Sequence, residues 1–263
     1  MVKIKVLIEN NASAPGFLSE HGLSLYLETE RRRILFDAGQ SGQFAVNAEK
    51  IGVDLAMVDT AILSHGHYDH GGGLERFLEL NEKAPVYVNV HAFEPHFNGK
   101  KDIGLSPSLR ESGRLILVGE RTALDENMEL FPMSEFTPEY PVASQGLSVI
   151  RDGVRADEDF RHEQYLLIRD GGKRILFSGC SHAGILNIAG WFRPDVLVGG
   201  FHFKNLDPEG EGRAVLEQAA EALKKQPTVY YTCHCTGTAQ YEFLRERMGY
   251  QIRSLTAGQE LVL

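Results

Sequence analysis

The stretch "ILSHGHYDHGGGL" at residues 62–74 constrains this chain more than any other part of its sequence. An apolar run typical of a buried strand comes first, followed by three histidines and one aspartate within six positions, and then by three glycines. Glycine lets the backbone turn sharply and approach other groups closely. Apolar residues at i, i+3 and i+4 spacing then predict a helix from residue 73 to about 81. The stretch therefore predicts a strand that ends in a tight polar turn and leads into a helix.

The polar residues of this turn are His65, His67, Asp69 and His70. In an extended backbone, His-x-His places both imidazoles on one side, so that both can reach one ion. Asp69 and His70 can then face a second position nearby. Histidine nitrogen and carboxylate oxygen suit zinc, iron or manganese. The alternative is a solvated turn in which the histidines meet by chance, but the spacing and the strand-to-helix setting favour metal ligation.

Two further segments have the pattern of β-hairpins, over residues 23–39 and 163–179. The first has alternating leucines before a charged turn, and the second has Asp-Gly-Gly at its turn. Each ends in a similar sequence, "RRILFDAG" and "KRILFSGC", which hints at two related β-rich halves. Other strands are predicted over 3–8, 60–65, 85–91 and 228–234, and other helices over about 211–225 and 241–248.

The composition predicts a globular protein with a sizeable core, because 43% of the 263 residues are hydrophobic and 24% are charged. We expect one domain over residues 1–263, in which two packed sheets have helices outside. Residues 93–145 are rich in proline, glycine and charge and show no helical period. This segment is expected to form an elaborate surface loop or a cap over a site.

Several classes of function are disfavoured by what the sequence contains. A net charge of −9 argues against binding to nucleic acid or to an anionic membrane. No apolar run approaches the ~18 residues of a membrane span, and the N-terminus lacks a signal-peptide core. Three cysteines are too few, and odd in number, for a disulfide framework. We therefore expect a cytoplasmic protein whose partner is neither nucleic acid nor membrane.

The motif "SHGHYDHGGGL" resembles the His-x-His-x-Asp-His signature of the metallo-β-lactamase superfamily, and "LFDAG" resembles its first motif. The resemblance implies an α/β (α+β) fold, a four-layer αββα sandwich of two mixed sheets with helices outside. It also implies that Asp37 lies beneath the histidine loop and holds it by hydrogen bonds. Four more stretches resemble the group named for 7,8-dihydropterin-6-methyl-4-(β-D-ribofuranosyl)aminobenzene-5'-phosphate synthase: "SEHGLSLYLE", "GCSHAGILNI", "VGGFH" and "YTCHCTG".

The resemblance implies a binuclear metal site, whose ligands carried over residue by residue are His65, His67, Asp69, His70, His182 and His234. Asp69 and His70 are also expected to belong to the catalytic machinery. His234 fits the last ligand because it ends a predicted strand near the C-terminus. Alternation along that strand predicts that Cys233 and Cys235 point away from the face that His234 uses, as buried small residues.

The middle ligand departs from the ordinary superfamily pattern, which has a histidine before a hairpin and a bridging aspartate after it. Here the hairpin is preceded by His162 and followed by Cys180 and His182, and no aspartate occupies the bridging corner. His182 is the first choice because it lies at a strand-end corner, and Cys180, His162 and His202 are held in reserve. His202 is equally well explained as a core histidine. We hypothesise that the missing carboxylate lowers the negative charge at the ions and favours a substrate oxyanion. Equal metal occupancy together with unchanged activity in Cys180→Asp would contradict this hypothesis.

The resemblance implies two divalent metal ions, with zinc expected first and manganese, iron or magnesium as alternatives. Such ions activate a water molecule and polarise a substrate oxygen. No G-x-S-x-G elbow and no phosphate-binding glycine loop supplies another chemistry. The first hypothesis is a metal-dependent hydrolase of a small anionic substrate, of which a phosphorylated molecule is one kind. The alternatives are a synthase-type condensation on a pterin-like substrate and a non-catalytic metal-binding domain.

Other charged residues and histidines carry weaker expectations. Three of the cations in residues 93–145 either meet an anionic ligand or are ordinary solvated charges, which we favour; they are Lys100, Lys101 and Arg110. His21 either approaches the site together with Glu20 or serves a turn. No ligand role is expected for His91 or His96.

Overall fold

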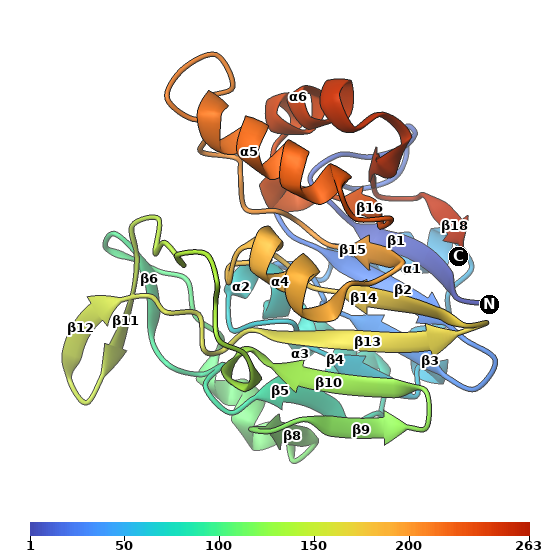
Figure 1. Cartoon of the computed structure of the whole chain (residues 1–263). Helices are drawn as coiled ribbons and strands as arrows, with labels where there is room; N and C mark the ends of the chain where they lie inside the picture. The colour runs from blue at the N-terminus through green and yellow to red at the C-terminus, as the bar shows by residue number, and fades with distance from the viewer.

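The first of two large sheets contains seven strands of mixed direction, in a computed structural model that describes residues 1–263 (Figure 1). In spatial order these are β18 (Glu260–Val262), β1 (Lys3–Ile8), β2 (Ser24–Glu28), β3 (Arg33–Phe36), β4 (Thr60–Ile62), β5 (Val86–Asn89) and β8 (Leu115–Val118). The strands from β18 to β3 pair antiparallel, whereas β3, β4, β5 and β8 run parallel. The carboxyl ends of β3 and β4 therefore lie at the same edge of this sheet.

The second large sheet has the same number of strands and the same division into parallel and antiparallel parts. In spatial order these are β17 (Ile252–Ser254), β16 (Val229–Thr232), β15 (Val196–Val198), β14 (Lys173–Phe177), β13 (Gln164–Asp170), β10 (Met128–Pro132) and β9 (Thr122–Asp125). The strands from β14 to β17 are parallel, and β14, β13, β10 and β9 pair antiparallel.

Helices cover the outer face of each large sheet. They are α1 (Gln43–Lys50) and α3 (Leu74–Leu80) in the first half, and α4 (Ile185–Phe192), α5 (Arg213–Lys224) and α6 (Thr238–Met248) in the second, whereas the short α2 (Tyr68–Gly71) lies within the turn after β4. One hydrophobic cluster joins α1 and α3 to the first sheet, another joins α4, α5 and α6 to the second, and a third fills the space between the sheets. The four layers are therefore helix, sheet, sheet and helix, which confirms the predicted αββα sandwich.

Short 3₁₀ turns lie in several of the connections: η1 (Leu55–Met57), η2 (Pro107–Ser112), η3 (Met133–Glu135), η4 (His234–Thr236) and η5 (Gly249–Gln251). No helix of the chain is both long enough and apolar enough to cross a membrane.

The two predicted hairpins occupy corresponding places in the two sheets. The first is the antiparallel pair β2–β3, and the second is the antiparallel pair β13–β14. The phenylalanines that end the two "RILF" sequences face each other across the core, with the ring centroids of Phe36 and Phe177 5.7 Å apart. The sequence match between the halves thus lies at a matching structural position.

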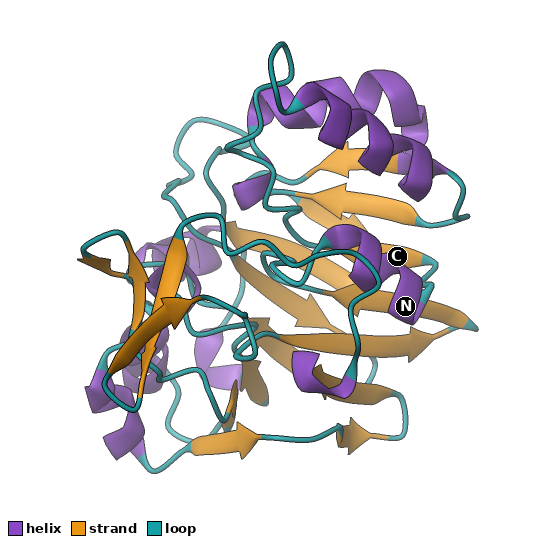
Figure 2. Ribbon diagram, turned by 60° about the vertical axis from the view of Figure 1, so that its left-hand side comes forward, coloured by secondary structure: helices purple, strands orange, loops and turns teal.

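A third, smaller sheet lies beyond the ends of the large sheets, at the left of Figure 1 and turned forward in Figure 2. Its antiparallel strands are β12 (Val154–Asp157), β11 (Leu147–Arg151), β6 (His96–Asn98) and β7 (Lys101–Asp102). Residues 93–145 are thus divided: β6 and β7 belong to this small sheet, whereas β8, β9 and β10 are strands of the large sheets. That the small-sheet part acts as a cap stays a prediction.

Candidate metal centre

The predicted ligands gather where the strands of both sheets end. The turn after β4 carries His65 to His70, the turn after β14 carries Cys180 and His182, and His234 follows β16. Because β3 and β4 run parallel in one sheet, and β14, β15 and β16 in the other, the polar residues that follow them meet at one edge of the sandwich. The centre is therefore assembled from both halves of the chain.

His65, His67 and His182 form one group of metal-binding character. One ring nitrogen of each lies within 4.8 Å of the others, and the rings of His65 and His182 are 4.7 Å apart. Burial lowers the pKa of all three imidazoles well below the usual value, so they are neutral. Nε2 of His65 and Nε2 of His67 are buried without a hydrogen-bond partner, whereas Nδ1 of His182 lies 3.3 Å from Glu163 Oε1. Unpaired, neutral imidazole nitrogens that converge in this way fit a divalent metal ion.

Asp69, His70 and His234 lie beside this group, together with Cys180. Asp69 Oδ2 is 3.3 Å from His234 Nε2, and His70 Nε2 is 3.1 Å from Cys180 Sγ. Nε2 of His234 nevertheless has no partner of hydrogen-bond geometry, as expected of two groups that could share an ion. Burial lowers the pKa of His234 to about 3, although Asp69 opposes this shift. The donor set of nitrogen, carboxylate oxygen and sulfur suits zinc or another transition metal.

The remaining ring nitrogens of two ligands are oriented by hydrogen bonds. His70 Nδ1 bonds to Asp37 Oδ2 at 2.6 Å, and His234 Nδ1 bonds to Asn10 Oδ1 at 2.8 Å. Since both partners are acceptors, each Nδ1 carries the proton, and each Nε2 offers its lone pair to the centre. Burial opposes protonation of His70, but the contact with Asp37 still raises its pKa.

Asp37 lies directly beneath the turn that carries His65 to His70. Its Oδ1 accepts a hydrogen bond from the backbone N–H of Ser64, and its Oδ2 accepts one from Ser64 Oγ, both at 2.7 Å. Asp37 is 1% exposed. With the bond to His70, it fixes both the entry to the turn and one ring within it.

Glu163 is a residue that the sequence analysis missed. It is fully buried, and it accepts hydrogen bonds from the backbone N–H of His182 at 2.7 Å, from that of Ala183 at 3.0 Å and from Tyr165 Oη at 2.8 Å. Burial raises the pKa of Glu163 to about 7. The signal in the sequence was a carboxylate directly before the strand sequence "QYLLI", whose five residues are all buried in the structure.

His21 approaches the centre from the N-terminal half. Its Nε2 is 3.2 Å from Asp69 Oδ2, and its ring lies 4.6 Å from that of His234. Burial alone would raise the pKa of Asp69, but the neighbouring imidazoles of His21 and His234 hold it well below the usual range. Glu20 does not accompany His21, because its carboxylate bonds to Ser41 instead.

The three reserve residues have different positions. Cys180 Sγ lies within 4.8 Å of ring nitrogens of His65 and His70, so the thiol borders both groups. The ring of His202 is 4.4 Å from that of His182, but His202 is part of no ligand group. His162 lies behind the turn, in a group with His96 and Glu158 that also includes His67.

The expectation for the two cysteines beside His234 is wrong in one respect. The strand β16 ends at Thr232, and His234 begins a 3₁₀ turn with φ of 49°, so strand alternation does not extend to Cys235. Cys233 packs in the core between the sheets as expected. Cys235 instead faces the site, with its Sγ 3.3 Å from the backbone N–H of His202.

Four of the corners at this edge contain a non-glycine residue in the left-handed region. They are Asp37 (φ 59°), Ser181 (φ 57°), His202 (φ 55°) and His234 (φ 49°), one after each of β3, β14, β15 and β16. This conformation costs an L-residue on the order of 1 kcal/mol. Strain of this kind concentrates at functional sites.

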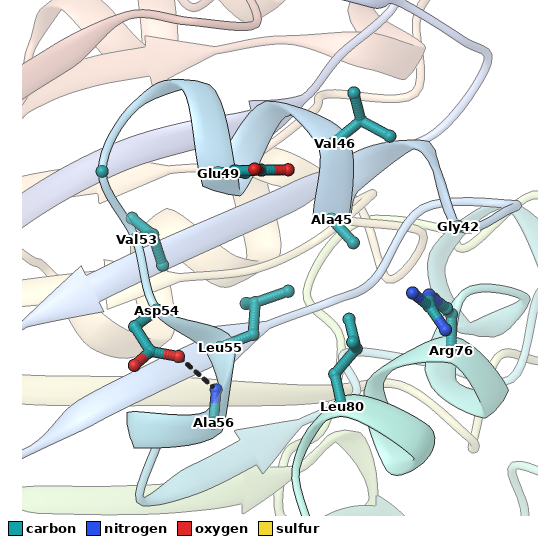
Figure 3. A pocket seen from close by; sticks show the side chains of 11 residues that line it. Gly42, Ala45, Val46, Glu49, Val53, Asp54, Leu55, Ala56, Arg76 and Leu80 are labelled. Atoms are coloured by element: carbon teal, nitrogen blue, oxygen red, sulfur yellow. Dashed lines mark hydrogen bonds between the residues drawn. The ribbon is translucent and has the colours of Figure 1, made fainter.

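The centre opens into a pocket of about 290 Å³. Its walls include four predicted ligands: His67, Asp69, His182 and His234. Polar and apolar residues complete the walls; they are Asn98, Lys101, Gln145, Lys204, Asn205, Ile103 and Leu147. A larger hollow of about 580 Å³ lies between α1 and α3 (Figure 3). Its walls contain no histidine or cysteine, and Asp54 there only caps the backbone N–H of Ala56. The smaller pocket is therefore the candidate site.

Comparisons with known proteins agree with this geometry. An uncharacterized protein of Methanocaldococcus jannaschii, MJ0448, is 29% identical over 246 residues, with 89% of this chain and 90% of that protein covered. The 7,8-dihydropterin-6-methyl-4-(beta-D-ribofuranosyl)-aminobenzene-5'-phosphate synthase of the same organism is 28% identical, with 98% and 95% covered. The crystal structure of Tm1679, described as a metal-dependent hydrolase of the beta-lactamase superfamily, matches with a TM-score of 0.83 and 29% identity, over 100% of this chain and 99% of that chain.

A sequence model of the metallo-beta-lactamase superfamily matches residues 20–157, which include Asp37 and the whole histidine turn. The match covers more than half of the chain. By sequence, by fold and by the convergence of its histidines, the chain belongs to the metallo-β-lactamase superfamily.

Proposed function

We propose that this protein is a metal-dependent hydrolase of a small anionic substrate, with two divalent ions, zinc first among them. The observation that carries the proposal is that buried imidazole nitrogens without a partner, Nε2 of His67 and Nε2 of His234, come from opposite halves of the chain to the wall of one pocket. His65, His67 and His182 would hold one ion, and Asp69, His70 and His234 would hold the other, with Cys180 between them.

Ions held there would supply Lewis-acid chemistry and a water nucleophile at neutral pH. The protein's own groups would orient and protect the reaction. Asp69 and His70 lie at the meeting point of the two ligand groups, and Asp37 fixes the ring of His70. His21 contacts Asp69 and lines the pocket with a partly exposed ring, so its Nε2 is placed to move a proton between Asp69 and the pocket.

An anionic substrate is supported by two lysines in the pocket wall. Lys101 comes from β7 and Lys204 from the segment after β15, and both line the pocket although the chain carries a net charge of −9. Tyr68 Oη accepts a hydrogen bond from Lys101 Nζ at 2.9 Å, and the contact with Tyr68 raises the pKa of Lys101. The other two cations considered from the sequence do not line the pocket: Lys100 is exposed, and Arg110 stacks on Phe93 at 4.6 Å.

A synthase that condenses a pterin-like molecule with a phosphorylated aromatic partner is the second candidate. It is supported by the 28% identity to the M. jannaschii synthase over nearly the full length of both chains. Both candidates share the metal centre and an anionic substrate, so they differ in the bond that is made or broken.

The test is the metal content of protein purified without chelator, for the native chain and for His67→Ala, with each then assayed on phosphodiester, thioester and lactone substrates. We expect about two metal ions per chain and hydrolysis of one class, with both reduced in His67→Ala. Metal without hydrolysis, together with condensation of the pterin and aromatic partners, would favour the synthase. Metal with neither reaction would favour a non-catalytic domain, and no metal would contradict the proposal.

The substrate charge is tested separately with lysine variants. Lys101→Met and Lys204→Met are each expected to raise KM for an anionic substrate about tenfold with little change in kcat, because a contact made equally in ground and transition states affects binding alone. Lys100→Met removes an exposed lysine next to the pocket and is the matched control. Equal effects in all three variants would show that only long-range charge matters.

A further inference from the structure

A second buried cluster of polar side chains lies behind the turn that carries His65 and His67. His96 comes from β6, and Glu158 and His162 come from the connection between β12 and β13. All three side chains are fully buried, and one ligating atom of each lies within 4.8 Å of the others and of His67. By composition alone, this cluster could be a third metal site.

The hydrogen bonds of the cluster argue against a metal ion. The backbone N–H of Gly66 donates to His162 Nδ1 at 2.8 Å, so the lone pair of that nitrogen is already used. A neutral imidazole has one donor nitrogen and one acceptor nitrogen, so His162 Nε2 carries the proton. Nε2 of His162 therefore faces its neighbours as a donor, 3.8 Å from Glu158 Oε1, and it has no lone pair for a metal.

The other two residues complete the arrangement. His96 Nδ1 bonds to Glu158 Oε2 at 2.6 Å, which leaves the lone pair on His96 Nε2. The rings of His96 and His162 lie 4.0 Å apart, and Nε2 of each is buried without a partner. One donor and two acceptors thus lie close together, a pattern that suits one buried water molecule better than a cation.

We propose that His162 is a positioning residue. Its ring packs beside His96 and Glu158, and it accepts the Gly66 N–H. It thereby fixes the backbone between His65 and His67 in the conformation that binds metal. On its other side, Gly66 packs tightly against the backbone of Ala92. A Cβ at residue 66 would lie 2.1 Å from the carbonyl oxygen of Ala92, so there is no room for a side chain. Without the acceptor, the Gly66 N–H would be a buried donor without a partner, and the turn would have to shift to satisfy it.

The cluster also joins the small sheet to the metal turn. His96 belongs to β6, and Lys101 of the neighbouring β7 lines the substrate pocket. Tyr68, next to His67, donates its backbone N–H to the carbonyl oxygen of Ile103 at 2.9 Å. His162 would therefore set the geometry of the metal turn whichever reaction the centre performs.

The test compares His162→Asn with His162→Leu. Asparagine Oδ1 takes the place of Nδ1 and can accept the Gly66 N–H, whereas leucine fills similar space without an acceptor. We expect His162→Leu to bind metal about tenfold more weakly in competition with a chelator, and His162→Asn to stay within about threefold of the native protein. The absorption spectrum of the cobalt(II)-loaded protein should shift in His162→Leu and be restored in His162→Asn.

Equal losses in the two variants would overturn the proposal, because the ring would then act by packing alone. A native stoichiometry of three ions per chain, falling to two in both variants, would replace it with a third metal site. A measurement on the native holoprotein does not depend on how the variants fold: the histidine side-chain ¹⁵N spectrum should show His162 protonated at Nε2 and unprotonated at Nδ1. Protonation at Nδ1, or a metal-bound Nε2, would contradict the assignment.

Discussion

Two buried carboxylates, Asp37 and Glu163, support the two corners of the metal centre in different ways. Asp37 bonds to a ligand ring, His70, as well as to Ser64. Glu163 bonds to the backbone N–H groups of His182 and Ala183, while Nδ1 of the His182 ring stays unpaired at 3.3 Å from its carboxylate. At the first corner, the carboxylate thus fixes the orientation of a histidine ring. At the second corner, it fixes the backbone only.

The ring of the second corner is oriented by packing instead. The ring of Phe160 stacks on that of His182, with centroids 4.5 Å apart and planes inclined by 7°. Phe160 is fully buried and belongs to the same connection as Glu158 and His162. The first corner therefore depends on a charged hydrogen bond to a histidine ring. The second corner depends on hydrogen bonds to its backbone and on an aromatic stack, and each dependence can be tested.

The largest effect is expected from Asp37→Asn. The amide keeps the size of the side chain but places an NH₂ group against donors on Ser64 or His70, so the ring loses its orientation. We expect metal affinity to fall about 100-fold, at the upper end for residues that orient ligands. Metal content after dialysis against a weak chelator measures the loss. Native occupancy in this variant would show that the charged bond to His70 is dispensable.

Glu163→Gln is expected to have a smaller and more selective effect. Glutamine keeps one acceptor oxygen for the backbone of the second corner but places an NH₂ group near the other N–H. We expect the ion held by His182 to bind about tenfold more weakly while the other ion is retained. Stepwise removal of metal by a chelator distinguishes the two ions. Tyr165→Phe, which removes only the hydroxyl donor to Glu163, is the matched control.

Phe160→Leu tests the aromatic stack on His182. Leucine preserves an apolar side chain of comparable size but removes the flat surface, and we expect a loss on the order of 1 kcal/mol in the free energy of unfolding of the metal-free protein. Urea denaturation measures this value. If the stack orients the ring, the cobalt(II) spectrum of this variant also changes; an unchanged spectrum would mean that Phe160 serves packing only.

The smallest effect concerns the ion pairs that attach the small sheet to the second corner. Arg151 bonds to Glu94 and Asp159, and these bonds lower the pKa of both carboxyls although burial opposes the shift. A depressed carboxyl pKa stabilises the fold at neutral pH, and this contribution is lost as pH falls through the folded-state pKa. Arg151→Met should therefore lower the melting temperature by about 1–2 °C at pH 7 and by progressively less toward pH 3. A difference that does not change with pH would exclude the charge effect.

Much of the first corner could be predicted because its information is local. His65 to His70 follow one strand within six residues, and Asp37 ends a hairpin with a characteristic sequence. The hairpins 23–39 and 163–179 were also predictable, because alternation and turn residues mark them without reference to other parts of the chain. The structure has both as antiparallel pairs.

The second corner and the cluster behind the metal turn were harder to predict because their contacts join distant parts of the chain. Glu163 supports a turn 19 residues later, and His96 meets a glutamate 62 residues away, so no local spacing reveals either contact. Cys235 escaped prediction because the strand before it ends early in a left-handed turn at His234. The strands β8 to β10 lie in a stretch without clear periodicity, and β8 exposes two central residues at the edge of its sheet.

The left-handed corners at Asp37, Ser181, His202 and His234 have a consequence for anyone who would engineer this protein. Glycine at these positions would relax the backbone and stabilise the chain by up to roughly 1 kcal/mol each. The same substitutions would remove an orienting carboxylate, a buried hydroxyl contact, an imidazole in the pocket wall and a predicted metal ligand. Thermostability and the proposed activity therefore compete at these four positions, and a search for a more stable variant should leave them unchanged and alter the exposed faces of the helices.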